Sequence, residues 1–111
     1  MINKSRFDKN TASGGHNNTI LSSAVLPKGM SAPFAHAWGY LENGKEMEGH
    51  SHPSDEIYLV FAGKGTVVVG DEKAEVSCGD IIEIPPNAYH TMICGENTTL
   101  LWAALWWKQE N

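Results

Sequence analysis

The sequence has few basic residues and no long apolar run, and each shortage excludes a class of protein. Eight Lys and Arg residues stand against 13 Asp and Glu, which gives a formal net charge of −5. This balance repels nucleic-acid backbones and anionic membranes, so we expect neither as a partner. No apolar run reaches the roughly 18 residues that span a bilayer, and residues 1–10 lack the pattern of a signal peptide. We therefore expect a cytoplasmic protein.

Cysteine is also scarce, and a length of 111 residues leaves room for a single domain. Cys78 and Cys94 are the two cysteines of the chain. They have neither the close spacing of a zinc ribbon nor the density of a secreted disulfide scaffold. We expect both thiols to be reduced.

Short apolar segments separated by turn-forming residues follow a polar beginning. Residues 1–18 are rich in Asn, Gly and Ser, and we expect a flexible arm, or one ordered by a partner subunit, before one barrel domain over residues 19–111. Segments of strand length are predicted at 20–26, 34–41, 57–61, 66–69, 73–76, 81–84, 89–93 and 100–107. Gly- and Pro-containing turns between strands indicate an all-β sandwich or barrel, of which we favour a two-sheet jelly-roll barrel.

A pair of histidines in the middle of the chain is a candidate metal site. His50 and His52 project from the same face of a strand, about 6 to 7 Å apart. Glu56 has the same parity, and Pro53-Ser54-Asp55 allows a bend that returns its carboxylate to the same point. By itself, a His-x-His pair also fits two polar residues on a solvent-exposed face.

A fourth ligand would have to come from a distant strand. His90 is the only histidine downstream of the cluster, so the choice is forced if the site exists. Imidazole nitrogen and carboxylate oxygen suit one divalent ion of Zn, Mn, Fe, Ni or Co, and the sequence does not select among them.

The spacing around the histidine pair resembles the first conserved motif of the cupin superfamily. Gly44 is followed by five residues and His50, one residue and His52, three residues and Glu56, then six residues and Gly63. These positions match the motif at every defining residue.

A second segment resembles the other cupin motif, with two departures. Gly79, five residues, Pro85, one residue, Asn87, two residues and His90 follow its spacing, but Asn87 stands where a glycine is usual. Asparagine tolerates the left-handed conformation, so we expect the turn to survive. Cys94 replaces the usual final asparagine.

The resemblance implies a small cupin whose double-stranded β-helix barrel holds one divalent metal ion. Its ligands would be His50, His52, Glu56 and His90. Three histidines and one carboxylate leave one coordination position open in five-coordinate geometry and two in octahedral geometry. A small molecule with adjacent oxygens, such as a sugar, hydroxy acid, diol, keto-enol or dicarboxylate, could chelate there.

Strand parity adds three candidate pocket residues to the ligand set. Tyr58 shares a face with Glu56, while Met92 and Cys94 share a face with His90. Tyr58 fits either a proton donor or a core aromatic residue. Cys94 fits either a small buried hydrophobe or a redox-sensitive thiol or fifth ligand.

Two further segments carry large side chains. In residues 34–41 bulky and small residues alternate, so the bulky face packs in the barrel, stacks on a ligand or lies in a dimer interface. His36 on that face is a candidate acid or base near the site, or else a structural histidine. Residues 100–107 are apolar on both faces, which predicts burial on both sides. Because many small cupins resemble such an arrangement as dimers, we expect a homodimer.

Three functions remain open. The first is an enzyme, with iron supporting dioxygenase chemistry, or zinc, manganese or nickel supporting isomerase, lyase or decarboxylase chemistry. The second is a non-catalytic module that binds or senses a small ligand. The third is a structural cupin without metal, which a complete ligand set argues against. The preference for an enzyme rests on analogy, because one fold hosts many reactions.

Overall fold

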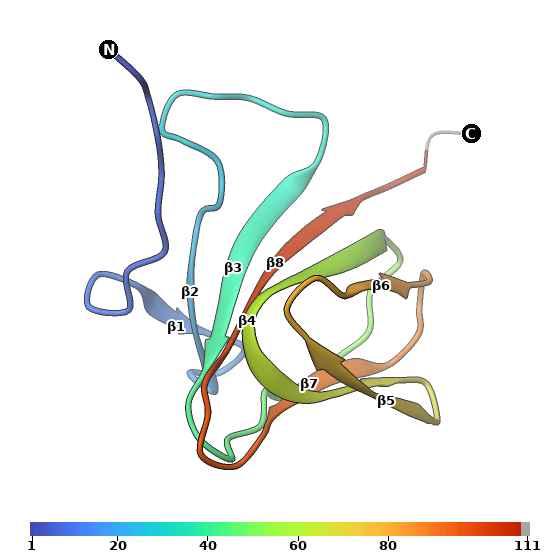
Figure 1. The fold of residues 1–111 in the computed structure, drawn as a ribbon. Coiled ribbons are helices and arrows are strands. Elements are labelled where there is room, and N and C mark those ends of the chain that lie inside the picture. The colour runs from blue at the N-terminus through green and yellow to red at the C-terminus, as the bar shows by residue number, and fades with distance from the viewer. Residues whose placement is uncertain (110–111) are drawn as a thin grey trace.

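In the computed structural model, which describes residues 1–109, the chain forms eight antiparallel strands and those residues contain no helix (Figure 1). The strands are β1 (Ser13–Gly15), β2 (Ile20–Ser23), β3 (Ala35–Leu41), β4 (Asp55–Val69), β5 (Glu72–Ser77), β6 (Ile81–Ile84), β7 (His90–Cys94) and β8 (Leu100–Trp107). The all-β prediction is confirmed. Residues 110 and 111, at the end of the predicted domain, lie outside the described residues.

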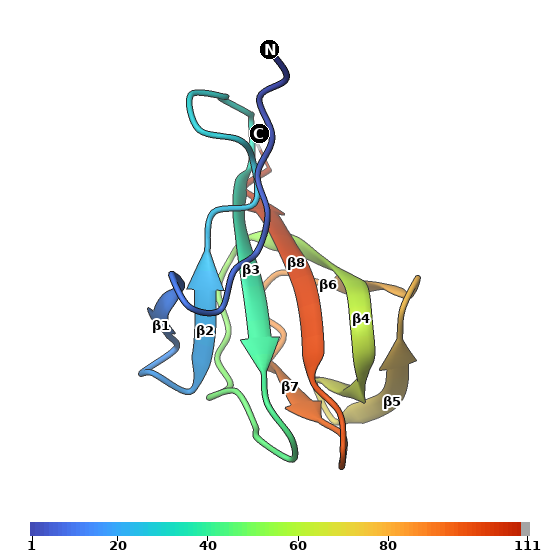
Figure 2. The same ribbon diagram turned by 60° about the vertical axis from the view of Figure 1, so that its left-hand side comes forward.

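The strand order is β1-β2-β3-β8-β4-β5, with β6 and β7 also paired to β4. Figure 2 shows β1, β2, β3 and β8 side by side as one wall, with β7 behind this wall and β5 beyond β4. Among the described residues, none lies in a helix of the length and apolarity that crossing a bilayer requires.

β4 is one strand of 15 residues, where the sequence predicted two strands joined by a turn. Its first part, residues 55–63, pairs with β8, and residues 56–59 also pair with β6. Its second part, residues 64–69, pairs with β5, and residues 65–69 also pair with β7. The predicted turn at residues 62–65 is therefore a corner at which the strand passes from one sheet to the other.

Glycine makes this corner possible. A register shift between Val60 and Ala62 marks a bulge in the ladder with β8. Gly63 follows it with a φ of 87°, and a Cβ there would lie 1.6 Å from the Thr99 carbonyl oxygen. The bulge leaves Phe61 out of the ladder with β8, but pairing continues on both sides of it, so the strand bends without ending. The glycine-rich composition alone predicts a turn here. The other two motif glycines, Gly44 and Gly79, also have positive φ values.

The bulky face of β3 points away from the barrel interior, and its small face points in. Trp38 packs edge-on against Phe61 at 4.9 Å between ring centroids, and Phe7 stacks on Tyr40 at 5.2 Å. On the inner face, a Cβ at Gly39 would lie 2.3 Å from the Trp102 ring. The small residues of β3 therefore make room for the indole of β8.

The segment of residues 1–18 is in contact with the barrel. Its strand β1 pairs with β2, and Phe7 lies against Trp38 and Tyr40. At the other end of the chain, β8 lies between β3 and β4. Leu100, Trp102 and Ala104 on its inner face are buried, whereas Leu101, Leu105, Trp106 and Trp107 stay partly exposed. The predicted burial of both faces is thus incomplete within one chain, and the homodimer stays a prediction.

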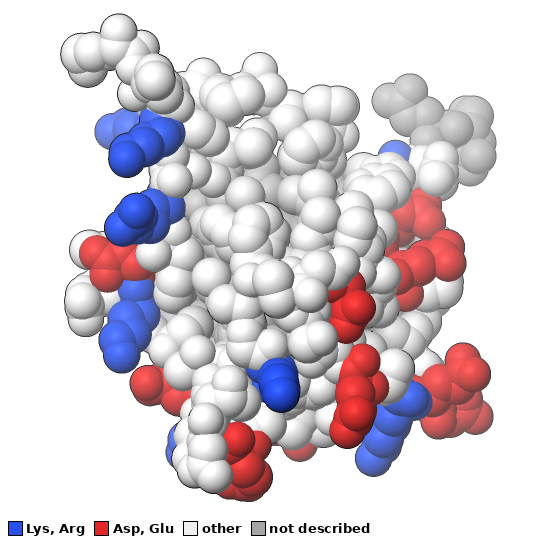
Figure 3. Space-filling model, in the orientation of Figure 1, with Lys and Arg blue, Asp and Glu red and all other residues white. Residues whose placement is uncertain are grey.

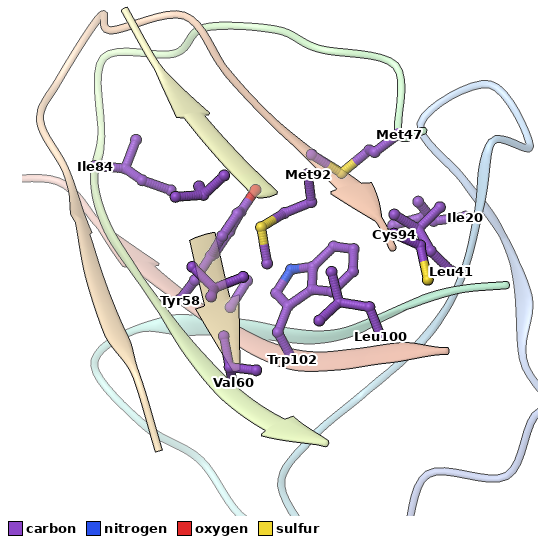
Figure 4. Packing of buried hydrophobic residues seen from close by; sticks show 13 residues of the cluster. Ile20, Leu41, Met47, Tyr58, Val60, Ile84, Met92, Cys94, Leu100 and Trp102 are labelled. Atoms are coloured by element: carbon purple, nitrogen blue, oxygen red, sulfur yellow. The ribbon is translucent and has the colours of Figure 1, made fainter. Parts of the chain in front are cut away.

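The apolar core fills the barrel, and most of its buried residues belong to β4, β7 and β8. Tyr58, Met92 and Trp102 gather at its centre (Figure 4), and each is at most 2% exposed. Ile84 and Leu100, both 0% exposed, lie on either side. This packing holds in place the strand residues that carry the polar groups described below.

Replacing Gly63 by alanine tests the corner. Gly70→Ala is the matched control, because Gly70 also has a positive φ but its Cβ would have no atom within 4 Å. Urea unfolding should show a loss of about 1 to 2 kcal/mol for Gly70→Ala and at least about 2 kcal/mol more for Gly63→Ala, which adds a backbone clash. Equal losses would mean that the corner depends on φ alone.

Candidate metal centre

A backbone bridge joins the two histidine-bearing segments. His50 N–H donates to the His90 carbonyl at 3.2 Å, and His90 N–H donates to the His50 carbonyl at 2.9 Å. Asn87 N–H adds a hydrogen bond of 2.7 Å to the His52 carbonyl. Asn87 has a φ of 68°, so the expectation that asparagine preserves the turn is confirmed. The bridge thereby places His50 and His90, which are 40 positions apart in the sequence, side by side.

The three imidazoles surround one point, and Glu56 lies beside them. Potential ligand atoms of His50, His52 and His90 lie within 4.8 Å of one another. Glu56 Oε1 is 3.0 Å from His52 Nε2 and 3.0 Å from His90 Nε2. His90 and Glu56 are 0% and 5% exposed, so the cluster reaches into the barrel interior. The structure thus brings together all four residues that the sequence named as ligands.

His90 Nε2 and Glu56 Oε1 lie close together without a hydrogen bond between them. His90 Nδ1 lies 2.9 Å from the Ala88 carbonyl, which can only accept, so Nδ1 carries the proton. In the neutral ring Nε2 then presents a lone pair, 3.0 Å from a carboxylate oxygen. The contact lacks hydrogen-bond geometry, and Nε2 is buried without a partner. A cation between the two atoms would convert this repulsion into attraction, which is the arrangement of a metal ligand oriented by a backbone carbonyl.

Two more ring nitrogens lack partners. His50 Nδ1 and His52 Nδ1 are both buried and unbonded. Leaving a buried polar group unsatisfied costs about 1 to 3 kcal/mol. Burial lowers the pKa of His50 to about 4, and the nearby His90 acts in the same direction. A neutral imidazole offers its lone pair to a metal, so this donor set fits a divalent ion of the first transition row.

The cluster opens onto a cavity of about 200 Å³. Its polar lining consists of His16, Ser22, His50, His52, Glu56 and the Tyr58 side chain, and its apolar lining of Ile20, Ala37, Trp38, Gly39, Met47, Trp102, Ala104 and Trp106. The cavity is small and more apolar than polar, and three of its polar groups are the imidazoles of His16, His50 and His52. Such a shape suits a small ligand with one polar end.

Tyr58 lies where parity predicted, at the wall of this cavity. Its ring centroid is 5.9 Å from that of His90 and 5.7 Å from that of Trp102. Burial raises the pKa of Tyr58 well above its usual value, and the Glu56 carboxylate acts in the same direction. Its hydroxyl therefore stays protonated, and it can serve as a hydrogen-bond donor.

The structure does not bring the other three candidates to the cavity. Met92 is 0% exposed in the apolar core. Cys94 Sγ donates to the Thr98 carbonyl at 3.3 Å, and burial raises the pKa of its thiol. His36 Nδ1 accepts hydrogen bonds from the backbone of Val25 and Leu26, at 3.0 and 3.4 Å. Parity was right for Met92 and Cys94, but core packing fills the interior at their level; His36 is on the outer face.

His16 is a cavity residue that the sequence reasoning missed. Its ring centroid is 4.3 Å from that of His50. Burial lowers its pKa, with partial compensation by the Glu56 carboxylate. The signal was present in the turn-forming run Gly14-Gly15-His16-Asn17-Asn18, since His and Asn are enriched in left-handed conformations and the run reads as a hairpin.

Charged side chains lie mainly around the edges of the face drawn in Figure 3. Lys and Arg follow the N-terminal segment with acidic side chains among them, and Asp and Glu are more numerous on the opposite edge and below. A broad uncharged area lies between them. On this face the described residues form no continuous basic surface.

Comparison with known proteins agrees with the geometry. The family model described as "Cupin domain" matches residues 37–107. Since the match covers more than half of the chain and the barrel is the one that the motifs implied, the protein belongs to the cupin family.

Individual relatives extend this assignment. An uncharacterized protein of Methanocaldococcus jannaschii is 32% identical over 93 residues, covering 80% of this chain and 73% of the relative. Acireductone dioxygenase 1 of Pectobacterium atrosepticum is 32% identical over 56 residues, covering 47% of this chain and 32% of that protein. The solved structure of the plu4264 protein of Photorhabdus luminescens has a TM-score of 0.84 at 26% identity, with 98% of this chain and 90% of that chain covered.

Histidine substitutions test the ligand set. His90→Ala should weaken binding of Zn²⁺ or Co²⁺ by at least about 10-fold, since the variant removes an imidazole oriented by Ala88. His36→Ala is the control and should leave metal affinity unchanged, because its ring bonds the backbone outside the cavity. Isothermal titration measures both. Equal losses in the two variants would show that the metal binds elsewhere.

The pKa of His50 predicts an acid-sensitive apoprotein. Its folded-state pKa is about 4, against 6.5 for an unperturbed histidine, so the unfolded chain binds more protons between these values. Stability is therefore lost as the pH falls from about 6.5 to 4. His50→Asn should flatten that part of the curve of unfolding free energy against pH, measured without metal. An unchanged slope would contradict the assignment.

Proposed function

We propose that the protein is a metal-dependent enzyme that acts on a small, oxygen-chelating substrate in the cavity beside His50. The observation that carries this proposal is the close approach of His90 Nε2 and Glu56 Oε1, 3.0 Å apart without a hydrogen bond between them. A metal with a purely structural role is normally closed off by protein ligands. Here a cavity of about 200 Å³ adjoins the cluster and leaves space for another ligand.

The side chains of this site form two groups: one would hold a metal, and the other shapes the pocket. His50, His52, Glu56 and His90 would hold the divalent ion, which when bound supplies Lewis acidity and an open coordination position. Tyr58 keeps its proton because its pKa is raised, so it can donate a hydrogen bond to a ligand oxygen.

Apolar side chains complete the pocket and limit what enters it. Ile20, Trp102 and Trp106 line the cavity and reduce the space for water around a bound ligand. Hydrogen bonds and charges are stronger in such a site than in water. A volume of about 200 Å³ is below the roughly 300 to 1,000 Å³ of most ligand pockets. The substrate is therefore small, in the class of hydroxy acids, keto-enols, diols or dicarboxylates.

Oxidative chemistry is the first reaction class to test. Support comes from the matching segment of acireductone dioxygenase 1, which covers 47% of this chain. The alternative is isomerase or lyase chemistry, in which the same residues would stabilise an enolate. The two classes differ in their need for O₂, which makes them separable by experiment.

Metal analysis followed by an oxygen electrode tests the proposal. Protein purified without an affinity tag should contain close to one divalent metal ion per chain. Protein loaded anaerobically with Fe²⁺ should consume O₂ with a member of a panel of 2-hydroxy acids, enediols and dicarboxylates. His90→Ala should abolish this consumption and His36→Ala should preserve it.

The outcomes separate the functions. Turnover of a panel member without O₂ consumption would select the isomerase or lyase class. Ligand binding without turnover in any metal form would replace the enzyme by a binding module. Absence of stoichiometric metal would overturn the proposal as a whole.

A further inference from the structure

The turn between β1 and β2 has an unusual backbone. His16, Asn17 and Asn18 have φ values of 49°, 58° and 62°, so three consecutive residues other than glycine lie in the left-handed region. This conformation costs roughly 1 to 2 kcal/mol per residue. Strained residues of this kind persist only where surrounding contacts hold them, and they cluster at functional sites.

Hydrogen bonds fix this turn to the segment that leads into His50. Asn17 Nδ2 donates to the Glu48 carboxylate, at 2.8 and 3.0 Å to its two oxygens. Glu48 N–H donates to Thr19 Oγ1 at 2.8 Å, and the Thr19 hydroxyl donates to the His16 carbonyl at 2.7 Å. The turn is thus held two residues before the first histidine of the cluster.

The result of this bracing is the position of one side chain. The His16 ring lies 4.3 Å from the His50 ring and lines the cavity. Ile20 and Ser22 of β2 line it as well, so the hairpin supplies part of the cavity wall. All three precede residue 37, where the match to the cupin domain begins. The shared barrel supplies the candidate ligands, and the hairpin adds a polar group beside them.

We propose that His16 is a substrate-binding residue, which donates a hydrogen bond from its imidazole to a distal oxygen of the chelated molecule. This inference rests on the proposed function. The substrate class narrows to molecules that chelate through two oxygens and carry a third oxygen acceptor. His16 lines the same cavity as His50 and lies beside it, so a molecule bound at the cluster has the His16 imidazole within the cavity wall. An acceptor placed beside Ile20 instead would be left unpaired at a cost.

A matched pair of chelators tests this role on protein loaded with Co²⁺. Malonate and acetylacetonate both bind a metal through two oxygens in a six-membered ring, but only malonate carries distal oxygens, where acetylacetonate has methyl groups. The visible absorption of Co²⁺ reports metal retention and chelator binding together. Each chelator is titrated into the wild type and the variants.

His16→Gly removes the imidazole and also the φ penalty, so the variant should unfold at or above the wild-type temperature. Its malonate affinity should fall about 10-fold, with acetylacetonate affinity within 2-fold of wild type. His16→Asn tolerates the left-handed region and is too short to replace the ring, so it should repeat the loss. Asn18→Gly is the control, because Asn18 has a similar φ but does not line the cavity, and neither affinity should change.

Each contrary outcome overturns a different statement. An unchanged malonate affinity in His16→Gly, or an equal loss for both chelators, would exclude the distal hydrogen bond. Loss of the Co²⁺ spectrum in His16→Gly before any chelator is added would make His16 a metal ligand instead. Wild-type protein that binds Co²⁺ but neither chelator would refute this substrate class, and wild type that binds no Co²⁺ would refute the proposed function as well.

Discussion

A single long strand that serves two sheets is the constraint on which this structure depends. β4 pairs with β8 and β6 before its corner and with β5 and β7 after it. The corner needs Gly63, whose backbone passes close to the Thr99 carbonyl. The first part of β4 carries Glu56 and Tyr58 in the sheet with β8. In its second part, Val69 pairs with His90 and so fixes the position of this histidine in the other sheet. The relative positions of the site residues therefore depend on the corner in β4.

The polar cluster lowers the stability of the fold, and this cost indicates a functional role for the cluster. The described structure leaves one ring nitrogen of each of the three clustered histidines buried and unbonded, and it places the lone pair of His90 against the Glu56 carboxylate. A barrel selected only for stability would fill this space with apolar residues, because buried polar groups are favourable only when they are satisfied. The backbone bridge between His50 and His90 maintains the arrangement in spite of that cost. Binding of a cation would recover the lost free energy and couple metal loading to stability.

The barrel and the N-terminal hairpin contribute different things to the cavity. Residues 37–107 supply the parts common to the family, including the four candidate ligands. The hairpin supplies His16, Ile20 and Ser22, which line the cavity beside the candidate ligands. The four candidate ligands therefore lie within the family match, whereas the cavity is lined both by residues of the match, such as Tyr58 and Trp102, and by the three residues of the hairpin. This division is consistent with one fold hosting many reactions.

The sequence by itself determined the all-β class, most strand positions and the four residues of the polar cluster. It could do so because strand parity is local, and because two spaced motifs name residues that any barrel of this family brings together. Tertiary structure alone decided that β4 continues through its corner, since a bend and a turn have the same glycine-rich composition and differ only in long-range pairing. Tertiary structure also decided where the two remaining histidines, His36 and His16, lie. His36 satisfies backbone N–H groups on the outer face, while His16 reaches the cavity because Asn17, Thr19 and Glu48 brace its turn. Contacts between residues about 30 positions apart place His16, and no local pattern encodes them.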